Sequence, residues 1–370
     1  MPTPSDSPDI TPLLRRLAER GGSDMFFSVG APPHLKQDGA CQPLETPPLA
    51  PGEVRRLVWP LLSAEQRAEF EREKELNLAV DLEGIGRFRL NLYLQRGELT
   101  MVARYVKSEI PSIAELGLPP VLEKLALRDR GLILVVGAAG SGKSTTLAAM
   151  LEQRNRSRSG HILCIEDPIE FVHRHRRSLI DQREVGLDTH SFAAALRNIL
   201  REAPDVIMIG EIRDLETMQH ALHYAETGHL CLATLHATGA PQAIERIVHF
   251  FPENARGQVL ADVAQNLLAI VAQRPVPGLD RHRAMAVELL LSTPHLRDLI
   301  QRDQLRELRQ AIAEAPEPGL QTFDQHLFQL HEAGRISAEE AVRHADSRTD
   351  LSLRIRLEHA AEESGPEFRA

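Results

Sequence analysis

The segment G-L-I-L-V-V-G-A-A-G-S-G-K-S-T-T-L-A-A-M, from Gly131 to Met150, decides the fold predicted for the rest of the chain. Its first part, Leu132 to Val136, is an apolar, β-branched run that predicts a buried strand. Its second part, Gly137 to Ser144, fits the pattern G-x-x-x-x-G-K-S and leads into small residues that predict a helix. A strand, a glycine-rich loop and a helix in this order predict a phosphate-binding loop in an α/β fold.

Each residue type in this loop suits phosphate binding. The glycines let consecutive backbone N–H groups turn inward around phosphate oxygens, and Lys143 adds a positive charge. Ser144 offers a hydroxyl to Mg²⁺ at the start of the helix. The alternative is a glycine-rich turn that binds nothing, but a Lys-Ser pair directly after Gly142 favours the phosphate loop. The nucleotide-binding candidates here are Gly137, Ala138, Ala139, Gly140, Ser141, Gly142, Lys143, Ser144 and Thr145.

Length, composition and charge limit the class of protein. The chain has 370 residues, of which 42% are apolar, so it can bury a large core and is expected to form two domains with appendages. The formal net charge of −9 argues against a broad nucleic-acid-binding surface. Apolar runs stay below the roughly 18 residues of a membrane span, and the amino terminus lacks signal-peptide features. We therefore expect a cytoplasmic protein with no integral membrane segment and no nucleic acid partner.

The three cysteines, Cys41, Cys164 and Cys231, are far apart and odd in number. This spacing indicates neither a disulfide framework nor a zinc site. We expect all three to be buried thiols.

The chain before the phosphate loop predicts a small α+β domain that ends near Lys107. Residues 87–95 alternate between apolar and polar, which predicts a strand with one packed face and one free face that carries Arg89. Segments 76–82 and 99–106 predict neighbouring antiparallel strands. Additional elements expected in this domain are a helix capped by Thr11 and ending near Arg20, a strand at 25–29, and helices at 51–62 and at 63–75, the latter with a serine cap.

Three segments after the phosphate loop repeat its design, a short apolar strand followed by a polar group. They are 162–165 with Glu166, 206–209 with Glu211 and 230–235 with His236. Because ligands of open parallel α/β sheets bind beyond the carboxyl ends of the strands, we expect these three groups to converge with Lys143 on one nucleotide. Helical stretches at 191–202 and 215–226 supply the crossovers that parallel strands require.

Hydrolysis of a γ-phosphoryl group needs a carboxylate that orients or deprotonates water. Glu211 is the best candidate for this base. Gly210 stands where ordinary P-loop enzymes carry a metal-holding Asp, so part of the Mg²⁺ and water positioning is assigned to Glu166. The alternative that Glu166, and with it Asp167 and Glu170, are helix caps or surface charges stays open. The metal-binding candidates are Ser144, Glu166 and Glu211.

Two histidines bracket the predicted strand 230–235. At about 3.3 Å per residue, His229 and His236 lie roughly 20 Å apart, so they cannot chelate one metal. We predict that His236, at the carboxyl end, senses the phosphate. A structural role is favoured for His229, although it stays among the nucleotide-binding candidates.

Together these motifs resemble the secretion ATPase superfamily, and within it the PilT/PilU family of type IV pilus retraction motors. The resemblance covers about residues 10–357, and the ending is more similar to the PilU branch. Its motifs are G-G-S-D (21–24), G-R-F-R (86–89), the phosphate loop, H-I-L-C-I-E-D-P-I-E-F (161–171), Q-R-E-V-G-L-D-T (182–189), D-V-I-M-I-G-E-I-R-D (205–214) and T-G-H-L-C-L-A-T-L-H-A (227–237).

The resemblance implies a PAS-like N-terminal α+β domain, a RecA-like P-loop ATPase core and a C-terminal helical region. The expected ranges are 1–9 disordered, 10–107 PAS-like, 108–120 linker, 121–300 ATPase, 301–357 helical, with helices at 304–315, 321–333 and 337–345, and 358–370 disordered. It also implies a homo-hexamer that hydrolyses ATP with Mg²⁺ to drive pilus retraction and twitching motility. A PilT-like ATPase and an inner-membrane platform protein are the implied partners, at the inner-membrane base of the pilus machine.

The resemblance further implies arginines that reach the nucleotide from a neighbouring subunit or domain. By motif position they are Arg89, Arg104, Arg201 and Arg246. From the residues alone, Arg89 has support on the polar face of its strand and Arg201 at a helix-to-strand junction. For Arg104 and Arg246 the residues alone favour a solvated surface charge.

Two other functions compete with pilus retraction. An assembly or secretion ATPase would push in the opposite direction, but such relatives usually carry a Cys₄ zinc insertion that is not visible here. A RecA-type DNA translocase would show salt-dependent stimulation by DNA, which the acidic net charge disfavours. A non-catalytic ring subunit is a further alternative, but all four convergent groups are in place. Residues 293–300 match only part of the segment that is tied to retraction in PilT.

Overall fold

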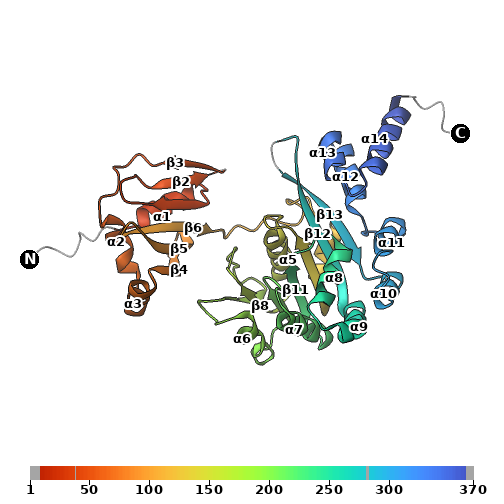
Figure 1. The fold of residues 1–370 in the computed structure, drawn as a ribbon, viewed down its shortest axis with the longest axis horizontal. Helices are drawn as coiled ribbons and strands as arrows, with labels where there is room; N and C mark the ends of the chain where they lie inside the picture. The colour runs from red at the N-terminus through yellow and green to blue at the C-terminus, as the bar shows by residue number, and fades with distance from the viewer. Residues whose placement is uncertain (1–8, 38, 281–282, 364–370) are drawn as a thin grey trace, which may run out of the picture. The chain divides into compact units, whose positions relative to one another are not determined.

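The computed structural model describes residues 9–37, 39–280 and 283–363, which form two compact units (Figure 1). The first unit ends at Glu109 and includes Glu170–Val172, and the second contains the remainder. The disorder predicted for residues 1–8 and 364–370 lies outside the described residues. The disorder predicted from Glu358 is wrong up to Glu363, because α14 (Arg348–Glu363) continues through these good helix formers.

The first unit is built on a six-stranded antiparallel sheet in the order β3-β2-β1-β6-β5-β4. The strands are β1 (Asp24–Phe27), β2 (His34–Gln37), β3 (Ala40–Pro43), β4 (Glu75–Leu82), β5 (Gly86–Gln95) and β6 (Glu98–Val106). The alternation predicted for residues 87–95 is confirmed at Phe88, Leu90 and Leu92, which are buried, but it is wrong at Leu94, which is 37% exposed. Cys41 is exposed on the edge strand β3, so its predicted burial is wrong, whereas Cys164 and Cys231 are buried.

Three helices and one 3₁₀ turn accompany this sheet. They are α1 (Thr11–Glu19), α2 (Glu53–Val58), the turn Trp59–Leu61 and α3 (Ala64–Glu73). Ser63 caps α3 as predicted, in a reciprocal capping box with Gln66. Thr11 does not cap α1. It is the first residue of that helix, and its N–H donates to Asp9 Oδ1 at 2.8 Å.

The second unit contains a seven-stranded sheet in the order β13-β12-β7-β11-β10-β8-β9. The strands are β7 (Gly131–Gly137), β8 (Gly160–Glu166), β9 (Ser178–Glu184), β10 (Val206–Ile209), β11 (Leu230–Leu235), β12 (Leu267–Pro277) and β13 (Arg283–Leu291). All neighbours pair in parallel except β12 and β13. The four predicted strands therefore lie side by side in the centre, and their carboxyl ends share one edge.

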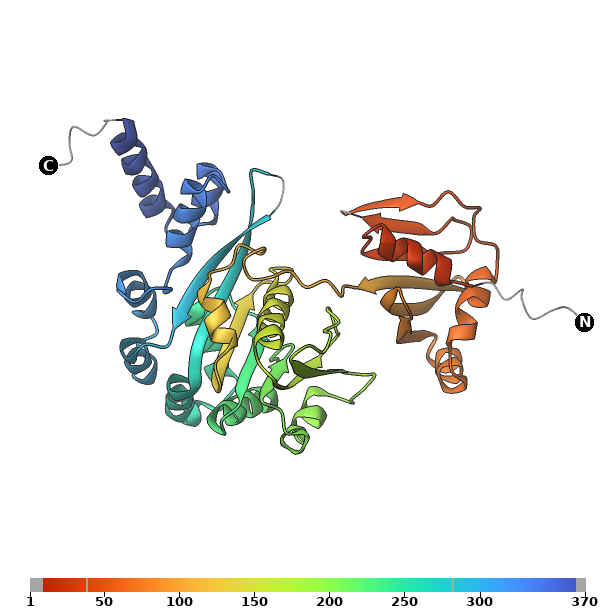
Figure 2. The same ribbon diagram turned by 180° about the vertical axis from the view of Figure 1, so that it is seen from behind.

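Helices cover both faces of this sheet (Figures 1 and 2). The helices described in this unit, besides α14, are α4 (Val121–Ala126), α5 (Lys143–Ser157), α6 (Phe192–Leu196), α7 (Leu215–Glu226), α8 (Ala240–His249), α9 (Arg256–Asn266), α10 (Pro294–Gln301), α11 (Leu308–Glu314), α12 (Phe323–Glu332) and α13 (Ala338–His344), with 3₁₀ turns at Ile199–Glu202 and Glu253–Ala255. The side chains of β7 alternate between two apolar clusters, one shared with α4 and α5 and the other with α7, α8 and α9. This doubly covered sheet confirms the predicted α/β core.

Part of the predicted linker, residues 108–120, packs against the second unit. Ile113 and Leu118 are buried in the same apolar cluster as residues of α4 and α5. The second half of the segment 108–120 therefore packs as part of the second unit.

Candidate nucleotide-binding site

The loop between β7 and α5 has the backbone geometry of a phosphate cradle. Gly137, Gly140 and Gly142 have φ values of 157°, 72° and 85°, in the region that favours glycine. A Cβ at Gly137 would lie 2.4 Å from Ser141 Oγ and 2.7 Å from the carbonyl oxygen of Gln273. The loop therefore closes this tightly only with glycine at its first position.

Lys143 lies inside this loop and is 9% exposed. Its Nζ donates to the carbonyl oxygens of Gly137 and Ala138 at 3.1 and 3.0 Å. Ser144 and Thr145 follow in the first turn of α5, where the unpaired N–H groups and the helix dipole favour an anion. A buried ammonium, a hydroxyl and converging N–H groups form a donor set that fits phosphate oxygens.

Glu166 is the last residue of β8 and is 8% exposed, and a side chain of β9 donates a hydrogen bond to its carboxylate. Gln182 Nε2 donates to Glu166 Oε1 at 2.9 Å. Glu184 stands directly beside Glu166 in the parallel ladder, and its Oε2 accepts from Ile169 N–H at 3.4 Å. A solvated surface charge does not describe Glu166, and the sequence analysis missed Gln182 and Glu184 because it did not predict β9.

Glu211 and His236 meet at the carboxyl ends of β10 and β11. Glu211 Oε1 lies 2.9 Å from His236 Nε2, and Glu211 Oε2 accepts from Arg213 Nε at 2.7 Å. Arg213 Nη1 reaches Asp167 Oδ2 at 3.1 Å. The hydrogen bond that Arg213 donates to Glu211 is the main cause that raises the pKa of Arg213. Arg213 was not among the predicted site residues.

The residue before Glu211 is Gly210, and the space around it is narrow. A Cβ at Gly210 would lie 3.2 Å from both Glu166 Cα and the carbonyl oxygen of Ile165. Its N–H donates to that same carbonyl at 2.8 Å, and its own carbonyl accepts from Thr234 Oγ1 at 2.5 Å. The backbone of β8 thus occupies the space that an aspartate side chain would need.

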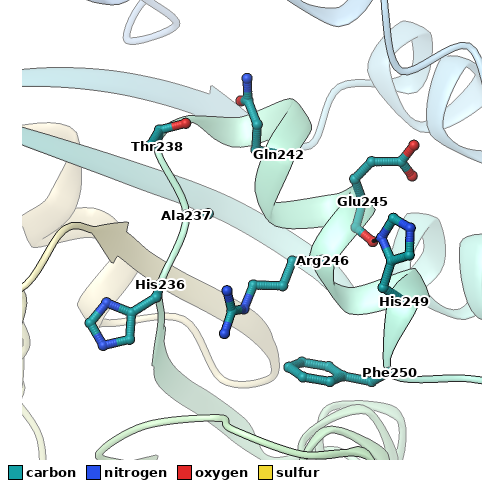
Figure 3. A pocket seen from close by; sticks show the side chains of 8 residues that line it. All are labelled: His236, Ala237, Thr238, Gln242, Glu245, Arg246, His249 and Phe250. Carbon is teal, nitrogen blue, oxygen red and sulfur yellow. Dashed lines mark hydrogen bonds between the residues drawn. The ribbon is translucent and has the colours of Figure 1, made fainter.

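A cavity of about 600 Å³ adjoins His236 (Figure 3). Its lining residues are His236, Ala237, Thr238, Gln242, Glu245, Arg246, His249 and Phe250. The Arg246 side chain extends from α8 toward His236 (Figure 3). Arg246 is exposed, as the residues alone favoured, but it shares a cavity with the predicted phosphate sensor.

Two predicted site residues lie at the opposite edge of the sheet. His229 precedes β11, and its carbonyl accepts from Gly131 N–H at the start of β7. Within this chain the length of β11 separates His229 from the phosphate loop, and its role at the nucleotide stays a prediction. Arg201 is exposed in the 3₁₀ turn before β10, also at the amino edge. Within one chain, neither residue joins the cluster around Glu211.

Arg89 and Arg104 face each other across β5 and β6 in the first unit. Arg104 Nε donates to Asp24 Oδ1 at 2.7 Å, and Asp24 is 4% exposed. Asp24 also pairs with Arg104 across β1 and β6. Both arginines lie on the polar face of the sheet, and the carboxylate of Asp24 holds one of them in place.

Comparison with known proteins identifies the family. Residues 74–317 match the family of type II/IV secretion system proteins. The chain is 51% identical over 346 residues to the type IV pilus ATPase PilU of Pseudomonas aeruginosa. The match covers 93% of this chain and 91% of that protein. This chain belongs to the PilT/PilU family of type IV pilus ATPases. The predicted RecA-like P-loop ATPase fold and ATP hydrolase class are thereby confirmed.

Identity to PilT is lower than identity to PilU, which supports the PilU branch of the family. The type IV pilus retraction ATPase PilT of Pseudomonas aeruginosa is 41% identical, over 90% of this chain and 97% of its own length. A crystal structure of the pilus retraction motor PilT with bound ADP has a TM-score of 0.87 and 40% identity, and covers 93% of this chain and 99% of that chain. Among the residues that the structure describes, no helix has the length and apolar character needed to cross a membrane.

Proposed function

We propose that this PilT/PilU family member hydrolyses ATP at the carboxyl edge of its second sheet and uses the energy to retract type IV pili. The observation that carries the proposal is the 2.9 Å contact between Glu211 and His236, on the same sheet edge as the phosphate loop. Similarity to PilU over nearly the whole chain favours retraction over secretion.

The roles of the residues follow from their chemistry. Lys143 and the loop N–H groups bind the phosphates, and Glu211 orients and deprotonates the attacking water. Arg213 holds the Glu211 carboxylate in place through its 2.7 Å hydrogen bond. His236, whose Nε2 lies 2.9 Å from the same carboxylate, contacts the γ-phosphate and links its presence to the base.

Mg²⁺ fits the oxygen donors at this edge. Ser144, Glu166 and Glu211 would hold it, and Mg²⁺ prefers one or two carboxylates completed by substrate phosphates and water. Among the described residues, no group of three or more His, Cys, Asp or Glu residues forms a metal site by itself. When bound, Mg²⁺ neutralises the charge on the phosphate oxygens.

The proposed working unit is a homo-hexamer, in which each chain has a PAS-like domain, an ATPase domain and a C-terminal helical region. Arg201 lies at the amino edge of its own sheet, so it serves a neighbouring subunit in this proposal, as do Arg89 and Arg104. Arg246, which shares a cavity with His236, serves its own chain. A PilT-like ATPase and an inner-membrane platform protein are the proposed partners, with the ring in the cytoplasm at the base of the pilus.

A retraction assay in cells tests this function. The chain is deleted and replaced by the wild type or by Lys143→Ala, in cells whose PilT-like partner carries the equivalent lysine substitution in its own phosphate loop. This chain is then the only active ATPase of the pair. Labelled surface pili are expected to shorten with the wild type and to stay extended with Lys143→Ala. Equal shortening with both would contradict the proposal, and loss of all surface pili on deletion would indicate assembly instead.

A further inference from the structure

Glu288 is a carboxylate in an apolar core, and the proposed ATPase mechanism assigns it no role. It lies on β13 and is 0% exposed. Ala286 and Leu290 lie two residues before and after Glu288 on β13, so their side chains share its face of the sheet. Both belong to the apolar cluster that also contains the buried face of α8. An apolar side chain would pack there without the desolvation penalty of a carboxylate, so packing alone does not explain a glutamate.

Glu288 makes one short hydrogen bond, to the start of α8. Its Oε1 accepts from the backbone N–H of Ala240 at 2.6 Å. Ala240 is the first residue of α8, and its N–H is one of those that a helix cannot pair internally. The N-cap residue of α8 is Gly239, which has no side chain to do this. A strand distant in sequence therefore supplies the cap, and its negative charge suits the helix dipole.

The capped helix carries the residues around the His236 cavity. Only three residues, 237–239, separate His236 from Ala240, and Arg246 lies further along α8 (Figure 3). A Cβ at Gly239 would lie 3.0 Å from Glu288 Oε1, so a glycine there lets the carboxylate reach the amide. A shift of the first turn of α8 would therefore be transmitted directly to His236.

The charged groups around Glu288 come from β12 and from the C-terminal helices. Burial raises the pKa of Glu288, the hydrogen bond from Ala240 and the charges of Arg309 and Arg274 lower it, and Asp346 raises it. Asp346 lies 3.0 Å from Arg274 and 3.3 Å from Arg309, measured between side-chain oxygen and nitrogen atoms. The surroundings of the cap are thus built from the C-terminal helical region.

We propose that Glu288 is a positioning residue for ATP hydrolysis, which fixes the first turn of α8 and thereby places His236 and Arg246 at the phosphates. This inference rests on the roles proposed above for these two residues. Glu288 itself does not touch the nucleotide in this proposal.

The test compares Glu288→Ala with Glu288→Gln in the full-length protein. Loss of the cap is expected to lower kcat for ATP about tenfold or more, because small misplacements of reacting groups slow catalysis strongly, while KM for ATP changes less than about twofold. The glutamine oxygen can accept the same bond at the same volume, so Glu288→Gln is expected to restore most of kcat. Ser337→Ala, which removes the cap of α13, is the matched control and should lower Tm but not kcat.

Two results would overturn the inference. One is a folded Glu288→Ala protein with unchanged kcat, and the other is a loss in Glu288→Gln as large as in Glu288→Ala. If Glu288→Ala does not fold, Gly239→Ala tests the same contact, since its methyl group would lie 3.0 Å from Glu288 Oε1 and crowd the carboxylate. Unchanged kcat there would count equally against the inference. A His236→Ala variant separates the two proposals. If His236→Ala keeps a normal kcat, the proposed role of His236 is wrong. If kcat falls in His236→Ala but stays normal in Glu288→Ala, only the proposed role of Glu288 is refuted.

Discussion

Glu211→Gln is expected to reduce ATP turnover at least about 100-fold and to leave ATP binding unchanged. The amide has the size of the carboxylate but cannot accept a proton from water, and general-base catalysis contributes about 10²- to 10⁴-fold in rate. The glutamine oxygen still accepts from Arg213 Nε, so the local structure is kept. Phosphate release and equilibrium ATP binding of the purified protein measure the two quantities.

Glu340→Gln is the matched control for this prediction. The Glu340 side chain is 18% exposed, against 19% for Glu211, and it too lies beside an arginine and a histidine, Arg343 and His344. It is located on α13, away from the phosphate loop, so its substitution should leave turnover unchanged. Near-normal turnover of Glu211→Gln would contradict the prediction and would indicate that Glu166 or another acid activates the attacking water.

Arg89→Ala and Arg104→Ala are each expected to slow turnover far more than they destabilise the fold. An arginine that stabilises transition-state charge is worth about 10³-fold or more in rate in other phosphoryl-transfer systems. An exposed arginine is worth under about 1 kcal/mol to the free energy of unfolding. The Arg104 side chain is 60% exposed, and its buried partner Asp24 keeps the hydrogen bond from Ser23 Oγ when Arg104 is removed. Arg87→Ala is the control, because Arg87 lies on the same strand and pairs with Asp81 at 2.9 Å.

A mixing experiment decides whether these arginines act across subunits. The Arg89→Ala, Arg104→Ala double mutant has an intact phosphate loop, and Lys143→Ala has intact arginines. If the arginines act in trans, mixed rings contain some complete sites, and ATPase activity rises above that of either mutant alone. If they act within one chain, every site has a defect. Absence of rescue despite demonstrated subunit exchange would refute the trans assignment.

The central strands of the second sheet were predictable because each carries a complete local signal. β7, β8, β10 and β11 are buried apolar runs that end in a polar group, and parallel pairing brings those ends to one edge. β12 was not predicted, since its sequence contains Pro275 and Pro277. In the structure the pairing of β12 with β7 ends at Gln273, before both prolines. The missing N–H groups of the prolines therefore leave no gap in that ladder.

Site residues that depend on strand neighbours could not be found from local sequence. Arg213 contacts Asp167 only because β10 and β8 are adjacent, and Gln182 reaches Glu166 only because β9 pairs beside β8. Glu288 meets Ala240, which is 48 residues away in the chain, and no local pattern marks that contact. Long-range pairing, rather than residue type, determines these roles.

The most direct test of ATP binding at the phosphate loop is the ATP affinity of Lys143→Ala, measured by calorimetry on the purified protein. A charged hydrogen bond is worth about 1.5–3 kcal/mol, so loss of the Lys143 ammonium is expected to weaken ATP binding about 10- to 100-fold. The wild type should bind one ATP per chain at saturation. Equal ATP affinity in the wild type and in a folded Lys143→Ala protein would contradict the assignment of residues 137–144 as the phosphate-binding loop.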